Sequence, residues 1–107
     1  MFVNLTPHEI HLPIGIVSPS GVVARCDEVS EQCGEVEGVP IISRRYGEVR
    51  GLPSNKMGVW LIVSHMCRVA CPERRDLLSP GDLTRDEKGQ ITGCTNLVVN
   101  MDRERMR

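Results

Sequence analysis

Arginines are the residues of this sequence that best suit binding chemistry. The guanidinium group is a planar fork of donors that matches the oxygens of a phosphate or a carboxylate. Two or three arginines that converge on one groove would form an anion site, and loops held by a rigid scaffold are where binding residues concentrate. The alternative is a solvated surface with local ion pairs, such as Arg85 with Asp86 or Glu87. Six arginines fall at the ends of expected strands or in loops: Arg25, Arg44, Arg45, Arg74, Arg75 and Arg85.

Metal binding and catalysis have weaker patterns. His8 and His11 are three residues apart, and His65, Cys67 and Cys71 form a second group. Structural zinc sites usually add a second pair of cysteines, which is missing here, so the two cysteines are better interpreted as small buried apolar residues. The sequence has no nucleophile elbow, cysteine-enzyme signature, P-loop or dinucleotide fingerprint. We therefore expect no metal, no cofactor and no catalytic residue.

Two segments concentrate polar groups beside a proline. Residues 4–8 place Asn, Thr and His around Pro7, and residues 75–82 mix two leucines with Arg and Asp before a Pro-Gly-Asp turn. Such segments can hold a ligand, and they can equally be turns whose polar groups bond to one another.

The elements that must position these residues are short. Residues 59–63 form the most apolar run and predict a central strand. Residues 64–71 are ambiguous between a strand and a helix that Ser64 caps and Pro72 ends. The polar segment 27–34 indicates a loop or an edge. The dipeptide at 37–38 and the four residues at 86–89 indicate hairpin turns. Further strands are expected in residues 1–5, 9–12, 21–26, 35–45, 46–49, 83–85 and 90–99.

The sequence thus predicts a mainly β fold, a small barrel or sandwich of about seven short strands with one short helix, and an α+β fold is the alternative. A length of 107 residues fits one domain. We place that domain at residues 1–99 and a charged tail at residues 100–107. A domain this small buries a modest share of its surface, so we expect a homo-oligomer.

Composition excludes several functions. The formal net charge is −1 and the aromatic residues are Phe2, Tyr46 and Trp60, whereas general nucleic-acid binders are basic and stack bases on several aromatic side chains. No apolar run is long enough to span a membrane, and the start lacks the pattern of a secretory signal. We therefore expect a cytoplasmic location, in the host cell if the protein is phage-encoded, with the five cysteines reduced.

Several segments together resemble a family of small, mostly hypothetical proteins of phages, prophages and bacterial genomes. They are Asn-Leu-Thr-Pro-His at the start, Tyr-Gly-Glu-Val with Gly-Leu-Pro at 46–53, and the block from Arg74 that contains Asp-Leu-Leu, Pro-Gly-Asp and Arg-Asp-Glu. The resemblance covers nearly the whole chain in the same order. It implies the context of a phage accessory protein, and such proteins often counter host defence by sequestering a nucleotide signal or by blocking a host protein.

From this context we predict a protein that binds and sequesters a small nucleotide or nucleotide-derived signal without catalysis. Arg25, Arg74 and Arg85 would meet phosphates, Tyr46 would stack on a base, and Asp76 would accept from a ribose hydroxyl or orient an arginine. Further hydrogen bonds would come from His8, Ser20 and Ser64, with several of the eight residues at a subunit interface.

Two alternatives remain from the sequence. The first is a protein-interaction module that inhibits a host enzyme, which predicts an exposed apolar patch or sheet edge. The second is a small enzyme that acts on a nucleotide.

Overall fold

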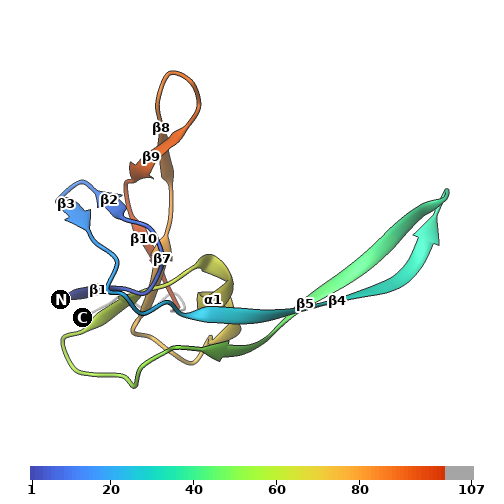
Figure 1. The fold of residues 1–107 in the computed structure, drawn as a ribbon, viewed down its shortest axis with the longest axis horizontal. Helices are drawn as coiled ribbons and strands as arrows, with labels where there is room; N and C mark the ends of the chain where they lie inside the picture. The colour runs from blue at the N-terminus through green and yellow to red at the C-terminus, as the bar shows by residue number, and fades with distance from the viewer. Residues whose placement is uncertain (101–107) are drawn as a thin grey trace.

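A four-stranded mixed sheet lies at the centre of the molecule (Figure 1). The computed structural model describes residues 1–100, which contain ten strands and one helix. Strand β6 is paired on both sides, in parallel with β1 and with β7, while β10 adds to β7 in the antiparallel sense. The sheet order is β1 (Phe2–Asn4), β6 (Trp60–Ile62), β7 (Leu77–Pro80) and β10 (Leu97–Val99).

The helix α1 (His65–Ala70) connects the parallel strands β6 and β7. Two neighbouring parallel strands need such a crossover, because a tight turn would make the second strand antiparallel to the first. Ser64 caps the helix, and its side-chain oxygen accepts a hydrogen bond of 3.2 Å from the backbone amide of Cys67. Cys67 faces the sheet and is buried. The core cluster consists of Leu5, Ala24, Leu61, Val63, Cys67 and Leu77.

Asn100 closes the far end of the helix. Its side-chain amide donates to the carbonyl oxygens of Arg68, Cys71 and Arg74 at 2.9, 2.9 and 3.1 Å. In return the guanidinium of Arg68 donates to Asn100 Oδ1 and to the hydroxyl of the buried Ser79. Asn100 is therefore bound to α1 and to the segment that follows it, although the expected tail begins at this residue. The rest of that expected tail, residues 101–107, lies outside the described residues.

Two short hairpins extend from the sheet on one side (Figure 1). The first pairs β2 (Ile10–Leu12) with β3 (Gly15–Val17), and the second pairs β8 (Leu83–Arg85) with β9 (Ile91–Cys94). Strand β2 also contacts β9, so the two hairpins lie side by side. We refer to everything outside β4 and β5, residues 1–24 and 51–100, as the body.

Strands β4 (Arg25–Val36) and β5 (Val39–Arg50) form a long two-stranded ribbon, which we call the arm (Figure 1). The arm projects away from the body, and the radius of gyration is 16.3 Å, against about 13 Å for a compact domain of this length. Glu37 and Gly38 join the strands with φ angles of 49° and 82°. Two successive positive φ angles are those of the turn that matches the natural twist of a hairpin.

The predicted mainly β fold with one short helix is confirmed. The central strand, the Ser64-capped helix and the hairpin turns at 37–38 and 86–89 are also found. A closed barrel does not form within residues 1–100, because the strands divide among four separate sheets. Most strands have only three or four residues, and the two longest leave the body together, so no continuous sheet exists that could close. The only helix of the described residues, α1, is too short to cross a membrane.

Candidate ligand-binding cleft

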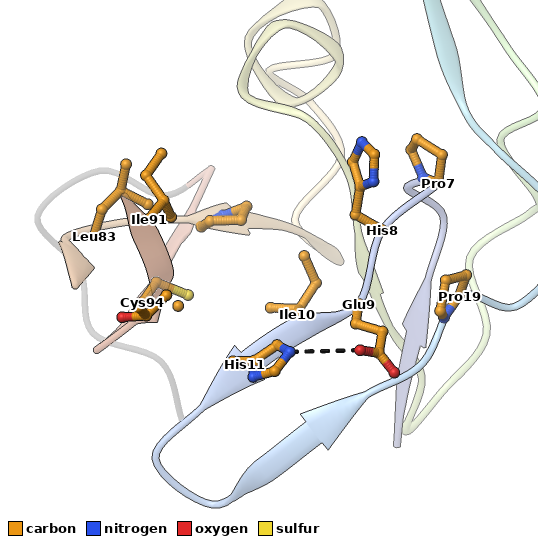
Figure 2. A pocket seen from close by; sticks show the side chains of 12 residues that line it. Pro7, His8, Glu9, Ile10, His11, Pro19, Leu83, Ile91 and Cys94 are labelled. Atoms are coloured by element: carbon orange, nitrogen blue, oxygen red, sulfur yellow. Dashed lines mark ion pairs between the residues drawn. The ribbon is translucent and has the colours of Figure 1, made fainter. Parts of the chain in front are cut away.

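A cleft of about 790 Å³ opens between the two short hairpins (Figure 2). That volume lies within the range of about 300 to 1,000 Å³ that small-molecule sites occupy. Its lining is mostly apolar, with Ile10, Leu83 and Ile91 among the side chains and three prolines at the margins. Most polar side chains come from residues 8–11, which supply His8, Glu9 and His11, and Thr92 of β9 adds a hydroxyl.

The floor of the cleft depends on a close approach between β2 and β9. A Cβ atom added at Gly93 would lie 2.6 Å from the backbone oxygen of His11 and 2.9 Å from its Cβ. Both distances are shorter than side chains tolerate, so only glycine lets the strands meet here. The neighbouring Cys94 is buried and also lines the cleft. Gly93 and Cys94 are therefore packing positions of β9.

Asn4 holds the loop that presents His8 to the cleft. The Asn4 side chain is buried, and its nitrogen donates to the carbonyl oxygens of His8 and Val17 at 2.7 and 3.1 Å. Its oxygen accepts from the backbone amide and the hydroxyl of Thr6 at 2.9 and 2.7 Å. All four hydrogen-bonding directions of the amide are thereby used. Asn4 and Thr6 are thus scaffold residues, and His8 is the exposed member of the motif.

The polar rim can donate and accept hydrogen bonds. His11 Nε2 lies 3.5 Å from Glu9 Oε1 and both side chains are exposed (Figure 2). The imidazole of His8 stands at the opposite part of the same segment, with Ile10 between the two histidines. Such a site suits a flat, partly apolar group in the cleft whose polar edge reaches the rim. Neither arginine nor lysine lines it.

Arg74 and Asp76 are brought together by the structure, away from this cleft. Arg74 Nε and a terminal nitrogen donate to the two Asp76 oxygens at 2.9 and 2.8 Å, and the same terminal nitrogen donates to the Pro53 carbonyl at 2.9 Å. The hydrogen bonds from Arg74 hold the pKa of Asp76 below its ordinary value, and the same bonds raise the pKa of Arg74. Asp76 therefore orients an arginine, and this pair fastens the segment before β7 to the loop at Pro53.

The remaining predicted residues are separated from one another. Ser64 caps α1, and Arg85 donates to the carbonyl oxygen of Gly89 at 2.9 Å within the β8–β9 turn. Ser20 lines a second, smaller hollow with Val22 and Leu52 among others. Arg25 begins the arm opposite Arg50, and Tyr46 lies exposed on the arm opposite Glu28. Of the eight predicted residues, only His8 lines the larger cleft.

The lining residues that the sequence did not assign to a ligand site are Glu9, His11, Thr92 and the apolar walls. The alternation of Ile10 and Leu12 with polar neighbours indicated a strand with one polar side, which is the signal that could have found His11. Leu83 and Ile91 carried no such signal, because the opposite hairpin meets β2 only through the tertiary fold.

No group of three His, Cys, Asp or Glu residues that could hold a metal ion is present within residues 1–100. Three cysteines gather at the root of the arm, where Cys26 and Cys71 pack against the core around Cys67. Burial raises the pKa of the Cys26 and Cys71 thiols, which disfavours the thiolate that attacks substrates or binds metals. No family model, curated protein or solved structure matches this chain.

Proposed function

We propose that the protein binds a small nucleotide-derived ligand in the cleft between the two short hairpins and holds it without turnover. The observation that carries this proposal is a cleft of about 790 Å³ with aliphatic walls and a rim of hydrogen-bonding side chains. A base is flat and largely apolar on its faces, so it suits the walls formed by Ile10, Leu83 and Ile91. Ribose and phosphate oxygens would meet the imidazoles of His8 and His11.

Sequestration is favoured over catalysis by what lines the cleft. A nucleophile needs a neighbouring base within hydrogen-bonding reach. The thiol in the cleft, Cys94, is buried beside Gly93 and has no such hydrogen-bonded partner within residues 1–100. Glu9 is the one carboxylate of the lining, so a pair of carboxylates sharing acid and base roles is not available there. The phage context implied by the resemblance fits a protein that removes an immune signal by binding it.

The test is native mass spectrometry and calorimetry with a panel of cyclic and linear nucleotides. We expect one ligand class to bind, to be released intact, and to lose at least about tenfold in affinity when His8 and His11 are both changed to alanine. His65→Ala is the matched control, because His65 lies on α1 outside the cleft. Ligand bound equally well by all three proteins would place the site elsewhere, and a changed ligand mass would show an enzyme.

A second candidate function is docking to another protein, and the arm is the observation that favours it. Six large apolar side chains of the arm are exposed: Val29, Val36, Val39, Ile41, Ile42 and Tyr46.

A further inference from the structure

One face of the arm gathers most of these exposed apolar side chains. Residues opposite each other in an antiparallel pair point to the same face, and alternate residues of a strand share a face. Val39, Ile41, Ser43 and Arg45 of β5 therefore lie on one face, together with their partners on β4. We define the apolar face of the arm as Val29, Val36, Val39 and Ile41.

An irregularity in β4 is what completes this face. Val29 and Val36 are seven residues apart, an odd number, so an unbroken strand would place them on opposite faces. The register shifts between Gln32 and Gly34, where one extra residue is inserted in β4. As a result Val29 pairs with Arg45 and Val36 pairs with Val39, both on the same face. The bulge therefore brings Val29 to the same face as Val36, Val39 and Ile41, with the pair of Glu31 and Ser43 between them.

Nothing in the described chain covers this face. Val36 and Val39 are 60% and 59% exposed, and Val29 and Ile41 are 43% and 41% exposed. A two-stranded ribbon standing alone in water is marginally stable at best. An arm of this length with an exposed apolar face therefore indicates a surface that another molecule buries.

The charges of the arm are divided between its strands. Strand β4 carries four carboxylates and one arginine, whereas β5 carries three arginines and one glutamate. On the opposite face, Glu28 and Arg44 already pair at 3.3 Å within the chain. On the apolar face, Glu31 and Arg45 form no ion pair within residues 1–100. These two charges can therefore pair with a partner whose surface places a basic group opposite Glu31 and an acidic group opposite Arg45.

We propose that this partner is a second copy of the chain, with the two arms packed apolar face to apolar face. A two-fold axis running along the arms places β4 of one copy over β5 of the other, because the rotation exchanges left and right. The apolar side chains then meet one another. Each Arg45 lies over the register position of Val29, two residues along β4 from Glu31 of the partner subunit. Arg45 and Glu31 thus approach opposite charges of the partner, which a flipped arrangement that stacks like strands would not achieve.

The size of the arm sets the expected strength of the dimer. Strands of 12 residues extend roughly 40 Å, and a ribbon is roughly 10 Å wide, so two stacked faces bury on the order of 800 Å². Stable interfaces usually bury about 1,200 to 2,000 Å². We therefore expect a dimer with a dissociation constant in the micromolar range, which separates on dilution.

Two neighbouring isoleucines provide a matched test. Ile41 belongs to the apolar face, while Ile42 pairs with Gln32 on the opposite face, and the two are 41% and 48% exposed. Sedimentation velocity and light scattering of the whole protein would be recorded between about 1 and 200 µM. We expect a dimer that dissociates on dilution, a more than tenfold weaker dimer for Ile41→Arg, and little change for Ile42→Arg.

Circular dichroism of both variants would show whether the body stays folded, because neither residue belongs to the core. Three outcomes would overturn the proposal: a wild-type monomer throughout the concentration range, equal weakening by both substitutions, or a dimer that ignores both. A monomer that instead binds an unrelated protein through this face would assign the arm to the docking function. Because neither substitution touches the cleft, ligand binding tests the proposed function separately.

Discussion

Strand β6 of the body is short and buried, whereas strand β5 of the arm is long and exposed. β6 has three residues, and Leu61 and Ile62 are both buried between two neighbouring strands. β5 has 12 residues and one neighbour, and its residues are exposed except for Val49 at the root. Burial, and not the number of hydrogen-bonded pairs, therefore decides which region contributes to stability. The body buries its side chains through its own contacts, whereas the arm buries almost none.

The largest expected effect is the difference in the free energy of unfolding between a truncated core side chain of the body and a truncated side chain of the arm. Leu77→Ala removes a fully buried side chain and should lower the free energy of unfolding by about 3 kcal/mol. Ile41→Ala, on the arm, should lower it by less than about 0.5 kcal/mol in dilute protein, where the arm is uncovered. Urea unfolding curves of both variants measure this. Similar losses would mean that the arm is part of the cooperative unit of the body.

The second expected effect compares two ion pairs. Asp76 of the body is 7% exposed and makes two short hydrogen bonds with Arg74, so Asp76→Asn should cost about 2 kcal/mol at neutral pH. Glu28 of the arm pairs with Arg44 at 3.3 Å with both side chains exposed, and Glu28→Gln should cost less than about 0.5 kcal/mol. Urea unfolding at pH 7 compares the two.

The pH dependence of the Asp76 effect has a definite sign. The folded pKa of Asp76 is lowered, so its stabilising contribution is fully present above the unfolded pKa, near about 4. It is lost as the pH falls through the lower folded pKa, because the proton then binds the native state as well. The difference between wild type and Asp76→Asn should therefore shrink below about pH 4. A difference that stays constant from pH 7 to acid would show that the carboxylate charge plays no part.

The smallest expected effect concerns the turn of the arm. Glu37 has a φ of 49°, a left-handed conformation that asparagine adopts more readily than glutamate. Glu37→Asn should stabilise the ribbon by a few tenths of a kcal/mol, about 0.5 at most. Amide hydrogen exchange would show slower exchange in β4 and β5 and unchanged exchange in the body. Faster exchange in the arm would mean that the Glu37 side chain has a role of its own there.

The sequence predicted the elements whose signals are local. The apolar run at Val59–Val63 predicted the centre of the sheet. Ser64 and Pro72 bounded a segment whose sequence is ambiguous between helix and strand, and the structure has a helix there. Strand β7 was missed because Leu77 and Leu78 are only two apolar residues before Pro80, which favours a turn. The segment 27–34 was interpreted as a loop or an edge because a ribbon exposed on both faces needs no apolar alternation.

The candidate site could be predicted only in part. His8 was selected from its position beside Pro7, and it lines the cleft. Arg74 and Asp76 were selected together, and they do pair, but their bonds stay within the chain. The apolar walls could not be predicted from the sequence, because Ile10 and Ile91 are brought together by two hairpins that are distant in the chain. A cleft between hairpins is a property of tertiary packing and leaves no pattern in one segment.

The strand order of the central sheet has a consequence for the time course of synthesis. Phe2–Asn4 at the start of the chain pairs with Trp60–Ile62, and Leu97–Val99 pairs with residues 78–80. The sheet therefore cannot be completed on the ribosome until nearly 100 residues have emerged. Strands β4 and β5 are separated by only two residues, so they can pair as soon as both have emerged. Local pairings form soonest. The arm can accordingly form on a nascent chain whose central sheet is still incomplete.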